Sequence, residues 1–166
     1  GNVLKMQYTM PHFMGYRFAL FNYATKETEG YVDFDYFKIE DKISDCRWAD
    51  VCYADDELEG HKLDIYLPDT GKSSHKVVVL IYGSVWFANN MKQNAFQAFG
   101  RSLLDKGFAV VSINHRSSRD AKFPAQINDV KAAIRFIRAN AAKYKLDTSF
   151  IGITGFSSGG HLASLA

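Results

Sequence analysis

The feature that most constrains the fold is the stretch from Gly155 to Gly159, which has the pattern Gly-x-Ser-x-Gly. Residues 150–154 before it form an apolar run typical of a buried strand, and residues 161–166 after it are typical of the first turns of a helix. A strand that passes into a helix over so few residues needs a sharp turn, which holds Ser157 in a strained backbone conformation. Glycines on either side allow strand and helix to pack closely because they lack a Cβ atom.

Strand and helix patterns alternate upstream of this turn. Three continuous apolar runs predict buried strands, and two amphipathic stretches between them predict helices. These segments are, in order, residues 77–82, 93–106, 108–113, 124–144 and 150–154. Two further strands are predicted before them, at 47–53 and 62–67. The alternation predicts right-handed β-α-β units and an α/β fold with a mostly parallel sheet.

The composition is that of a globular chain without a strongly charged face. Hydrophobic residues make up 47% of the 166 residues, and 20 basic residues nearly balance 18 acidic ones, so neither nucleic acid nor an anionic membrane is an expected partner. No apolar run reaches the length of a membrane span. Residues 1–45 are expected to form an N-terminal arm or cap with one strand, and residues 46–166 the α/β core. Cys46 and Cys52 are too few for a zinc site and are expected to be half-buried thiols.

Three segments together carry a resemblance to a known family. They are the strand at 63–68, the helix at 123–141 and the turn with its helix at 155–163. In this order the chain resembles the α/β-hydrolases, and more narrowly the bacterial carboxylesterases related to hormone-sensitive lipase and to acetyl-xylan and feruloyl esterases. The resemblance covers roughly residues 47–166. It implies the N-terminal part of an α/β-hydrolase fold, with helices on both faces of a sheet that is incomplete after the turn.

The resemblance implies a serine carboxylic-ester hydrolase with Ser157 as its nucleophile. The family's oxyanion loop is usually His-Gly-Gly-Gly-Trp, where residues 82–86 of this chain are Tyr-Gly-Ser-Val-Trp. The chemistry needs N–H donors aimed at the oxyanion and not glycine as such, so the backbone amides of Ser84, Val85 and Ser158 are the expected oxyanion hole. The hydroxyl of Ser158 is expected to be incidental. No metal or organic cofactor is implied.

Other residues fall near the expected site. Trp86, His115 and Arg116 are candidates for the pocket wall, with a place in the core as the alternative for Trp86 and a structural role as the alternative for His115. His161 lies on the helix that leads away from the serine and is expected to be structural, bonded beneath the turn.

Four polar residues are expected to have structural or surface positions. In the resembled family an acid is kept at the position of Asp129, which implies an internal ion pair or hydrogen bond and not the catalytic acid. Asp64, within a predicted strand, is interpreted in the same way. His61 and His75 are expected to be surface or loop residues.

The resembled family places its catalytic acid and histidine after the serine, whereas nine residues follow Ser157 here. Three alternatives follow. The chain is part of a longer or complemented esterase that acts through an acyl-enzyme on a small-molecule or polysaccharide-linked ester; it is a silent hydrolase that binds a ligand or partner; or it takes its base from His161, His115 or another copy. The edge of strand 150–154 is a candidate for self-association or for a complementing chain. The compartment stays open, with a secreted or periplasmic location in a bacterium favoured.

Overall fold

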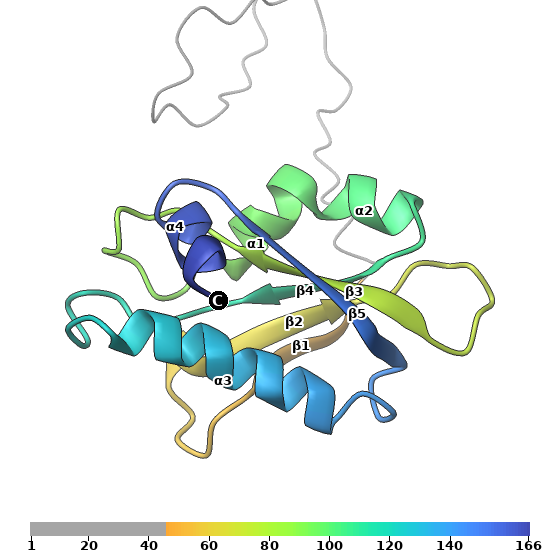
Figure 1. The fold of residues 1–166 in the computed structure, drawn as a ribbon, viewed down its shortest axis with the longest axis horizontal. Helices are drawn as coiled ribbons and strands as arrows, with labels where there is room; N and C mark the ends of the chain where they lie inside the picture. Colours follow the sequence, from red (N-terminus) through yellow and green to blue (C-terminus); the bar gives the residue numbers. More distant parts are fainter. Residues whose placement is uncertain (1–45) are drawn as a thin grey trace, which may run out of the picture. The chain divides into compact units, whose positions relative to one another are not determined.

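The apolar runs of the sequence form a mixed five-stranded sheet of order β1-β2-β4-β3-β5 in the computed structural model, which describes residues 46–166 (Figure 1). β3, β4 and β5 are parallel, as the alternating pattern predicts, and β1 and β2 are antiparallel to their neighbours. The elements in chain order are β1 (Cys46–Cys52), β2 (Lys62–Tyr66), β3 (His75–Ile81), α1 (Lys92–Ala95), α2 (Arg101–Asp105), β4 (Ala109–Ile113), α3 (Ala125–Ala139), β5 (Leu146–Gly155) and α4 (Ser158–Leu165). The arm or cap expected over residues 1–45 lies outside the described residues.

Helices cover both faces of the sheet, which explains the continuous apolar run of β3 from Val77 to Ile81. Alternate residues of β3 point to opposite faces. Val77, Val79 and Ile81 pack in one cluster with residues of α3 and with Leu162 of α4, whereas Val78 and Leu80 pack in another with residues of α1 and α2. None of the helices that the structure describes is long and apolar enough to cross a membrane.

The helix expected over residues 93–106 is divided into three pieces. α1 and α2 are separated by a π-turn at Phe96–Gly100, where the Phe96 ring stacks on Tyr66 at 3.6 Å between ring centroids. A π-turn holds more residues than an α-turn, so the residues after it face a different direction. Phe99 lies within this π-turn and is 43% exposed, although α-helical spacing predicts a buried position, while Leu104 of α2 is buried as expected.

α3 begins after Pro124 as predicted but ends at Ala139, several residues earlier than its apolar pattern suggests. The helix ends at Asn140, whose φ of −110° and ψ of 16° are not helical, and whose side-chain amide donates to the Phe136 carbonyl at 2.9 Å. Tyr144 is still buried, in the turn that leads to β5. An apolar residue can therefore continue the core without continuing the helix.

β5 is less buried than its apolar sequence predicts. It pairs with β3 only, among the strands that the structure describes, and Phe150 is 45% exposed. Its Gly155 end nevertheless stays in register with Ile81 at the end of β3. The carboxyl ends of these two neighbouring strands therefore lie side by side.

Candidate active site

The turn between β5 and α4 holds Ser157 in a conformation that most residues avoid. Its φ is 54° and its ψ is −123°, and the residue is exposed. A Cβ atom at Gly155 would overlap the backbone of Gly159, and one at Gly159 would overlap the carbonyl oxygens of Ile81 and Tyr82. The predicted backbone strain and the predicted need for both glycines are confirmed.

The loop after β3, residues 83–91, lies against this turn. A Cβ atom at Gly83 would come within 2.8 Å of the Ser157 Cβ and would overlap the Phe156 carbonyl oxygen. The Phe156 N–H also donates to the Ile81 carbonyl at 3.3 Å. The segment expected to carry oxyanion donors is thus in contact with the expected nucleophile, and we call residues 83–91 the oxyanion loop.

The hydroxyl of Ser158 is engaged, contrary to the expectation that it is incidental. It accepts a hydrogen bond of 3.0 Å from the Ser84 N–H. The backbone of Val85 has a φ of 52° and that of Trp86 a φ of 59°, so the loop follows a glycine-like path with side chains in place of glycine. Because of the bond to Ser158, the Ser84 N–H already has a hydrogen-bond acceptor within the protein.

The other side of the oxyanion loop is held by the loop after β4, residues 114–124. Ser118 donates its N–H to the Trp86 carbonyl at 2.7 Å, and Asn89 donates its side-chain amide to the Asp120 carboxylate at 2.9 Å. These bonds attach the loop to two positions that lie about thirty residues further along the chain.

His115 is fully buried at the end of β4 and has no surface to offer a substrate. Its ring stacks on Tyr82, with 4.6 Å between centroids, and its Nδ1 lies 2.9 Å from the Arg116 carbonyl. Its Nε2 has no hydrogen-bond partner among the described residues. Burial lowers the pKa of the imidazole, which favours its neutral form at pH 7. This position fits the structural alternative for His115.

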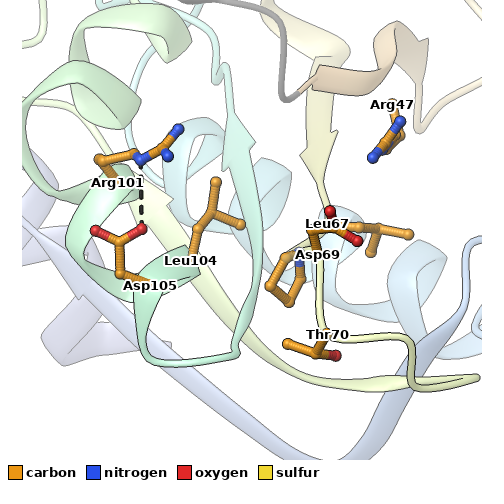
Figure 2. A pocket seen from close by; sticks show the side chains of 8 residues that line it. Arg47, Leu67, Asp69, Thr70, Arg101, Leu104 and Asp105 are labelled. Carbon is orange, nitrogen blue, oxygen red and sulfur yellow. Dashed lines mark ion pairs between the residues drawn. The ribbon is translucent and has the colours of Figure 1, made fainter.

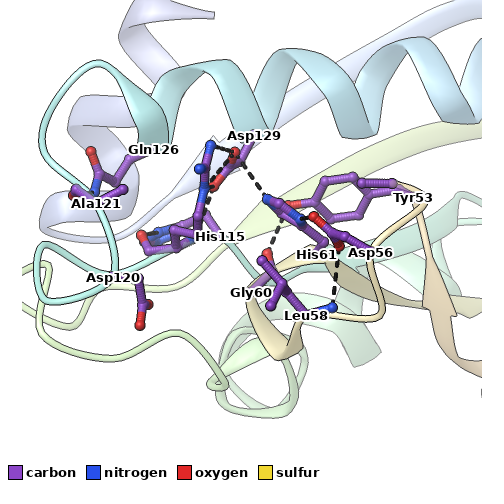
Figure 3. Close-up of polar contacts among 12 residues, drawn as sticks. Tyr53, Asp56, Leu58, Gly60, His61, His115, Asp120, Ala121, Gln126 and Asp129 are labelled. Atoms are coloured by element: carbon purple, nitrogen blue, oxygen red, sulfur yellow. Dashed lines mark hydrogen bonds and ion pairs between the residues drawn. The ribbon is translucent and has the colours of Figure 1, made fainter.

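Arg116, which follows β4, forms an ion pair with the buried carboxylate of Asp129 in α3, and its own side chain is half-buried. Figure 3 shows the Asp129 carboxylate beside His61. The guanidinium Nη2 lies 2.6 Å from the carboxylate, which also accepts the Arg116 N–H at 2.9 Å. His61 bridges Asp129, at 3.2 Å, and Asp56, at 2.7 Å. The anchoring role of Asp129 is confirmed. His61 lies in the connection between β1 and β2, as the loop alternative predicts, but the surface alternative is wrong because the imidazole is buried between two carboxylates.

A second buried ion pair lies beneath the far end of the oxyanion loop. The Lys92 ammonium is 3.1 Å from Asp64 and 2.8 Å from Asp50, and both Lys92 and Asp64 are buried. Burial acts to lower the pKa of Lys92, but the two carboxylates more than offset it and the net pKa is raised. The Lys92 N–H donates to the Asn114 side chain at 3.0 Å. The structural role of Asp64 is confirmed, and a buried aspartate in a strand is the signal that predicts a cation nearby.

Neither candidate histidine serves Ser157 as a base. His161 is exposed, and its ring lies edge-on to Trp86 at 5.7 Å, so the expectation that it is bonded beneath the turn is wrong. Within residues 46–166 no histidine nitrogen hydrogen-bonds to the Ser157 hydroxyl. The alternative in which His161 or His115 supplies the base therefore finds no geometry to support it.

Two cavities of the described region lie away from Ser157. One of about 280 Å³ is lined by Arg47, Asp69 and Asp105, near the end of β2 (Figure 2). Another of about 490 Å³ extends to His75 at the start of β3, the opposite end of that strand from the oxyanion loop. His75 is buried, so its expected surface position is also wrong. These cavities are not part of the candidate active site.

The structure offers no metal chemistry in the region that it describes. No group of three or more His, Cys, Asp or Glu side chains in that region could hold an ion. Cys46 and Cys52 are free and half-buried, as expected. Burial raises the pKa of the Cys46 thiol to about 11, so it is a poor nucleophile at neutral pH.

Two stretches of the chain match known families. Residues 63–166 match the BD-FAE family, and residues 1–40 match the C-terminal concanavalin A-like domain of β-xylosidases. A bifunctional GH43-CE protein of Bacteroides eggerthii, of known structure, is 90% identical over 99% of this chain and 23% of its own, with a TM-score of 0.72.

Two further relatives are esterases. A truncated carbohydrate esterase from gut microbiota is 63% identical and matches 70% of this chain and 41% of its own, with a TM-score of 0.70. Esterase LipQ of Mycobacterium tuberculosis is 41% identical over 90 residues, which are 54% of this chain and 21% of LipQ. The chain thus spans between 21% and 41% of the length of these relatives.

Proposed function

Because the chain belongs to the BD-FAE family of α/β-hydrolase esterases, we propose that it carries the nucleophile and the oxyanion hole of a serine ester hydrolase. The Ser157 hydroxyl attacks the ester carbonyl and the alcohol leaves. Water then hydrolyses the resulting acyl-enzyme, which releases the carboxylic acid and restores the serine hydroxyl. Backbone amides of Ser158 and of the oxyanion loop stabilise the negative charge that develops on the carbonyl oxygen.

The observation that carries this proposal is the backbone of Ser157. A non-glycine residue at a φ of 54° costs on the order of 1–2 kcal/mol, and such strain is found chiefly where function requires it. A purely structural turn at this position would be more stable with glycine. The exposed serine also contacts a loop whose amides can face the reacting carbonyl.

The substrate that we propose is an acyl ester of a xylose-containing carbohydrate. Two relatives of known structure carry a carbohydrate esterase in their descriptions, and residues 1–40 are similar to part of a β-xylosidase. A glycoside hydrolase and an esterase in one protein would act on the same decorated polysaccharide. The exposed rings of Trp86, Phe87 and Phe156 near Ser157 offer apolar surface against which a sugar ring can pack.

We expect the general base to come from outside residues 46–166, since none of the histidines described there reaches Ser157. Two proteins test this. One is the 166-residue chain, and the other is a chimaera in which the Bacteroides eggerthii relative supplies the sequence beyond residue 166. The expected result is turnover of p-nitrophenyl acetate and acetylated xylo-oligosaccharide by the chimaera, and little or none by the chain alone.

Ser157→Ala in the chimaera tests whether this serine is the nucleophile. It should abolish turnover and the covalent adduct of a fluorophosphonate probe, with the circular dichroism spectrum unchanged. Ser74→Ala, at an exposed position next to β3, is the matched control and should behave as wild type. Turnover that survives Ser157→Ala would contradict the mechanism. A chimaera that binds the oligosaccharide without hydrolysing any ester would favour a silent binding protein instead.

A further inference from the structure

The oxyanion loop is strained at two consecutive residues. Val85 and Trp86 both have left-handed φ values, 52° and 59°. For a β-branched residue such as valine this conformation is a true outlier, because the branched side chain crowds the backbone. Conformations of this kind persist only where the surrounding structure holds them. The contacts of the loop therefore matter more here than they would in a loop of glycines.

Most of the hydrogen bonds that hold the loop act on its far side. Ser118 binds the Trp86 carbonyl, and the Tyr82 hydroxyl lies 3.1 Å from the Ala88 carbonyl. These contacts tie residues 86–88 to the loop after β4 and to Tyr82, which directly follows β3. They leave open how the near side of the loop, which carries the proposed oxyanion donors, is aligned with the serine.

One hydrogen bond aligns the near side. Among the side chains of residues 155–161 in the described structure, only that of Ser158 hydrogen-bonds to the oxyanion loop, through the 3.0 Å bond that it accepts from Ser84. Ser158 is 3% exposed and is the first residue of α4, so its side chain has a rigid base. The Ser84 end of the bond is half-buried, and a hydrogen bond that is partly shielded from water is stronger than one in bulk water.

Ser158 contributes to the site through two groups, its backbone amide and its hydroxyl. The Ser158 backbone amide directly follows the nucleophile and is a proposed oxyanion donor, while its hydroxyl holds the loop that carries the other donor. The Ser84 N–H cannot point fully at Ser158 and at a substrate oxyanion at the same time. The Val85 N–H is the next donor along the loop and has the conformation that a glycine would adopt.

We propose that Ser158 is a positioning residue. Its hydroxyl accepts the Ser84 N–H, and this bond sets the Val85 amide at the distance from the turn at which the Val85 and Ser158 amides together bind the oxyanion. Ser84 then acts as a structural donor and not as an oxyanion donor. The proposal rests on the proposed function of Ser157, and it adds a side-chain role that the backbone chemistry of the site does not require.

The test uses Ser158→Ala in the chimaera, with Ser164→Ala as control, because Ser164 lies exposed on the same helix and bonds only to Gly160 within it. Loss of a single oxyanion donor lowers kcat by roughly 100- to 1,000-fold, so misalignment of one should lower it by about tenfold to a hundredfold. We expect KM to change less than about twofold, since the ground-state carbonyl barely uses the hole.

A double-mutant cycle with Val85→Gly separates positioning from general damage. The Ser158 bond helps to hold Val85 in its strained conformation, and glycine adopts that conformation without strain. Ser158→Ala should therefore lower kcat by a smaller factor in the Val85→Gly background than in wild type. Unchanged or faster turnover in Ser158→Ala would overturn the proposal, because it would show that the hydroxyl only competes with the substrate for the Ser84 amide.

Hydrogen exchange at the Ser84 amide provides a readout that does not need turnover. Ser158→Ala should speed exchange at Ser84, and Ser164→Ala should not. Exchange that is equally slow in both variants would also overturn the proposal. If Ser157→Ala keeps its turnover, the proposed mechanism fails. The exchange experiment then still decides whether the Ser158 hydroxyl holds the loop, so the two failures can be told apart.

Discussion

Two turns at the carboxyl ends of the neighbouring strands β3 and β5 reach the same kind of backbone by different means. The turn after β5 has one strained residue, Ser157, between glycines that leave no room for a Cβ atom. The loop after β3 has two strained residues, Val85 and Trp86, and both carry large side chains. The first turn is held by close backbone packing, and the second by side-chain hydrogen bonds.

The difference shows that crowding, and not a positive φ, makes glycine indispensable here. The side chains of Val85 and Trp86 have room at the surface, with exposed fractions of 51% and 37%, so each residue costs only backbone strain. At Gly159 a side chain would meet the carbonyl oxygens of β3 directly. Four predictions test this comparison, in order of decreasing effect.

The largest effect is expected for Gly159→Ala. The new methyl group overlaps the carbonyl oxygens of Ile81 and Tyr82, which belong to backbone that cannot move without breaking the sheet. We expect a loss of more than about 4 kcal/mol in the free energy of unfolding, or no folded protein, in urea denaturation followed by circular dichroism. Gly71→Ala is the control, because Gly71 has a φ of 69° but open space around it, and should cost about 1 kcal/mol. Equal costs at the two glycines would contradict the role of crowding.

The next effect concerns the buried ion pair that anchors the far end of the oxyanion loop. Lys92→Met leaves Asp64 buried without its cation and should lower the free energy of unfolding by about 3–5 kcal/mol. The double variant Lys92→Met/Asp64→Leu removes both charges and should recover most of that loss. A double variant as unstable as Lys92→Met alone would show that packing, and not the unpaired charge, causes the damage.

Smaller effects of opposite sign are expected from glycine at the strained positions. Ser157→Gly and Val85→Gly each relieve about 1–2 kcal/mol of backbone strain, partly offset by about 0.5–1 kcal/mol from the more flexible unfolded chain. Both should therefore raise the urea midpoint slightly, while Ser157→Gly also abolishes labelling by the fluorophosphonate probe. A fall in stability for Ser157→Gly would mean that the serine side chain stabilises the turn. That result would contradict the interpretation that the strained serine lowers stability and is kept for its function.

The smallest effect is a pH dependence. Burial lowers the pKa values of His115 and His75 below the usual 6.5, so in the unfolded chain these groups bind protons at a higher pH than in the folded protein. Their contribution to stability is complete above about pH 6.5 and is lost as the pH falls below it. His115→Gln should make the fall in unfolding free energy between pH 7.5 and 5 less steep, measured in urea. Ser74→Ala, at an exposed position without a titratable side chain, should leave the slope unchanged.

The parts of the fold that could be predicted depend on local patterns. The strands, the start of α3 and the glycine turn at Ser157 each have a signal within a few residues: an apolar run, a proline or a fixed spacing. Packing disturbs such signals where it adds a constraint of its own. The π-turn beside Phe96 lets that ring stack on Tyr66, and Asn140 ends α3 within a stretch that is otherwise helical in character.

The sequence by itself determined the class of fold, the position of the strained serine and the family to which the chain belongs, because each depends on residues close together in the chain. Only the tertiary structure decided which polar side chains hydrogen-bond or form ion pairs with one another. The Ser158 hydroxyl meets the Ser84 amide across 74 residues, and Lys92 meets Asp64 and Asp50 across the sheet. His61 became a buried bridge for the same reason. Hydrogen bonds and ion pairs select partners by distance and direction in space, and the order of residues along a chain does not contain that information until the chain has folded.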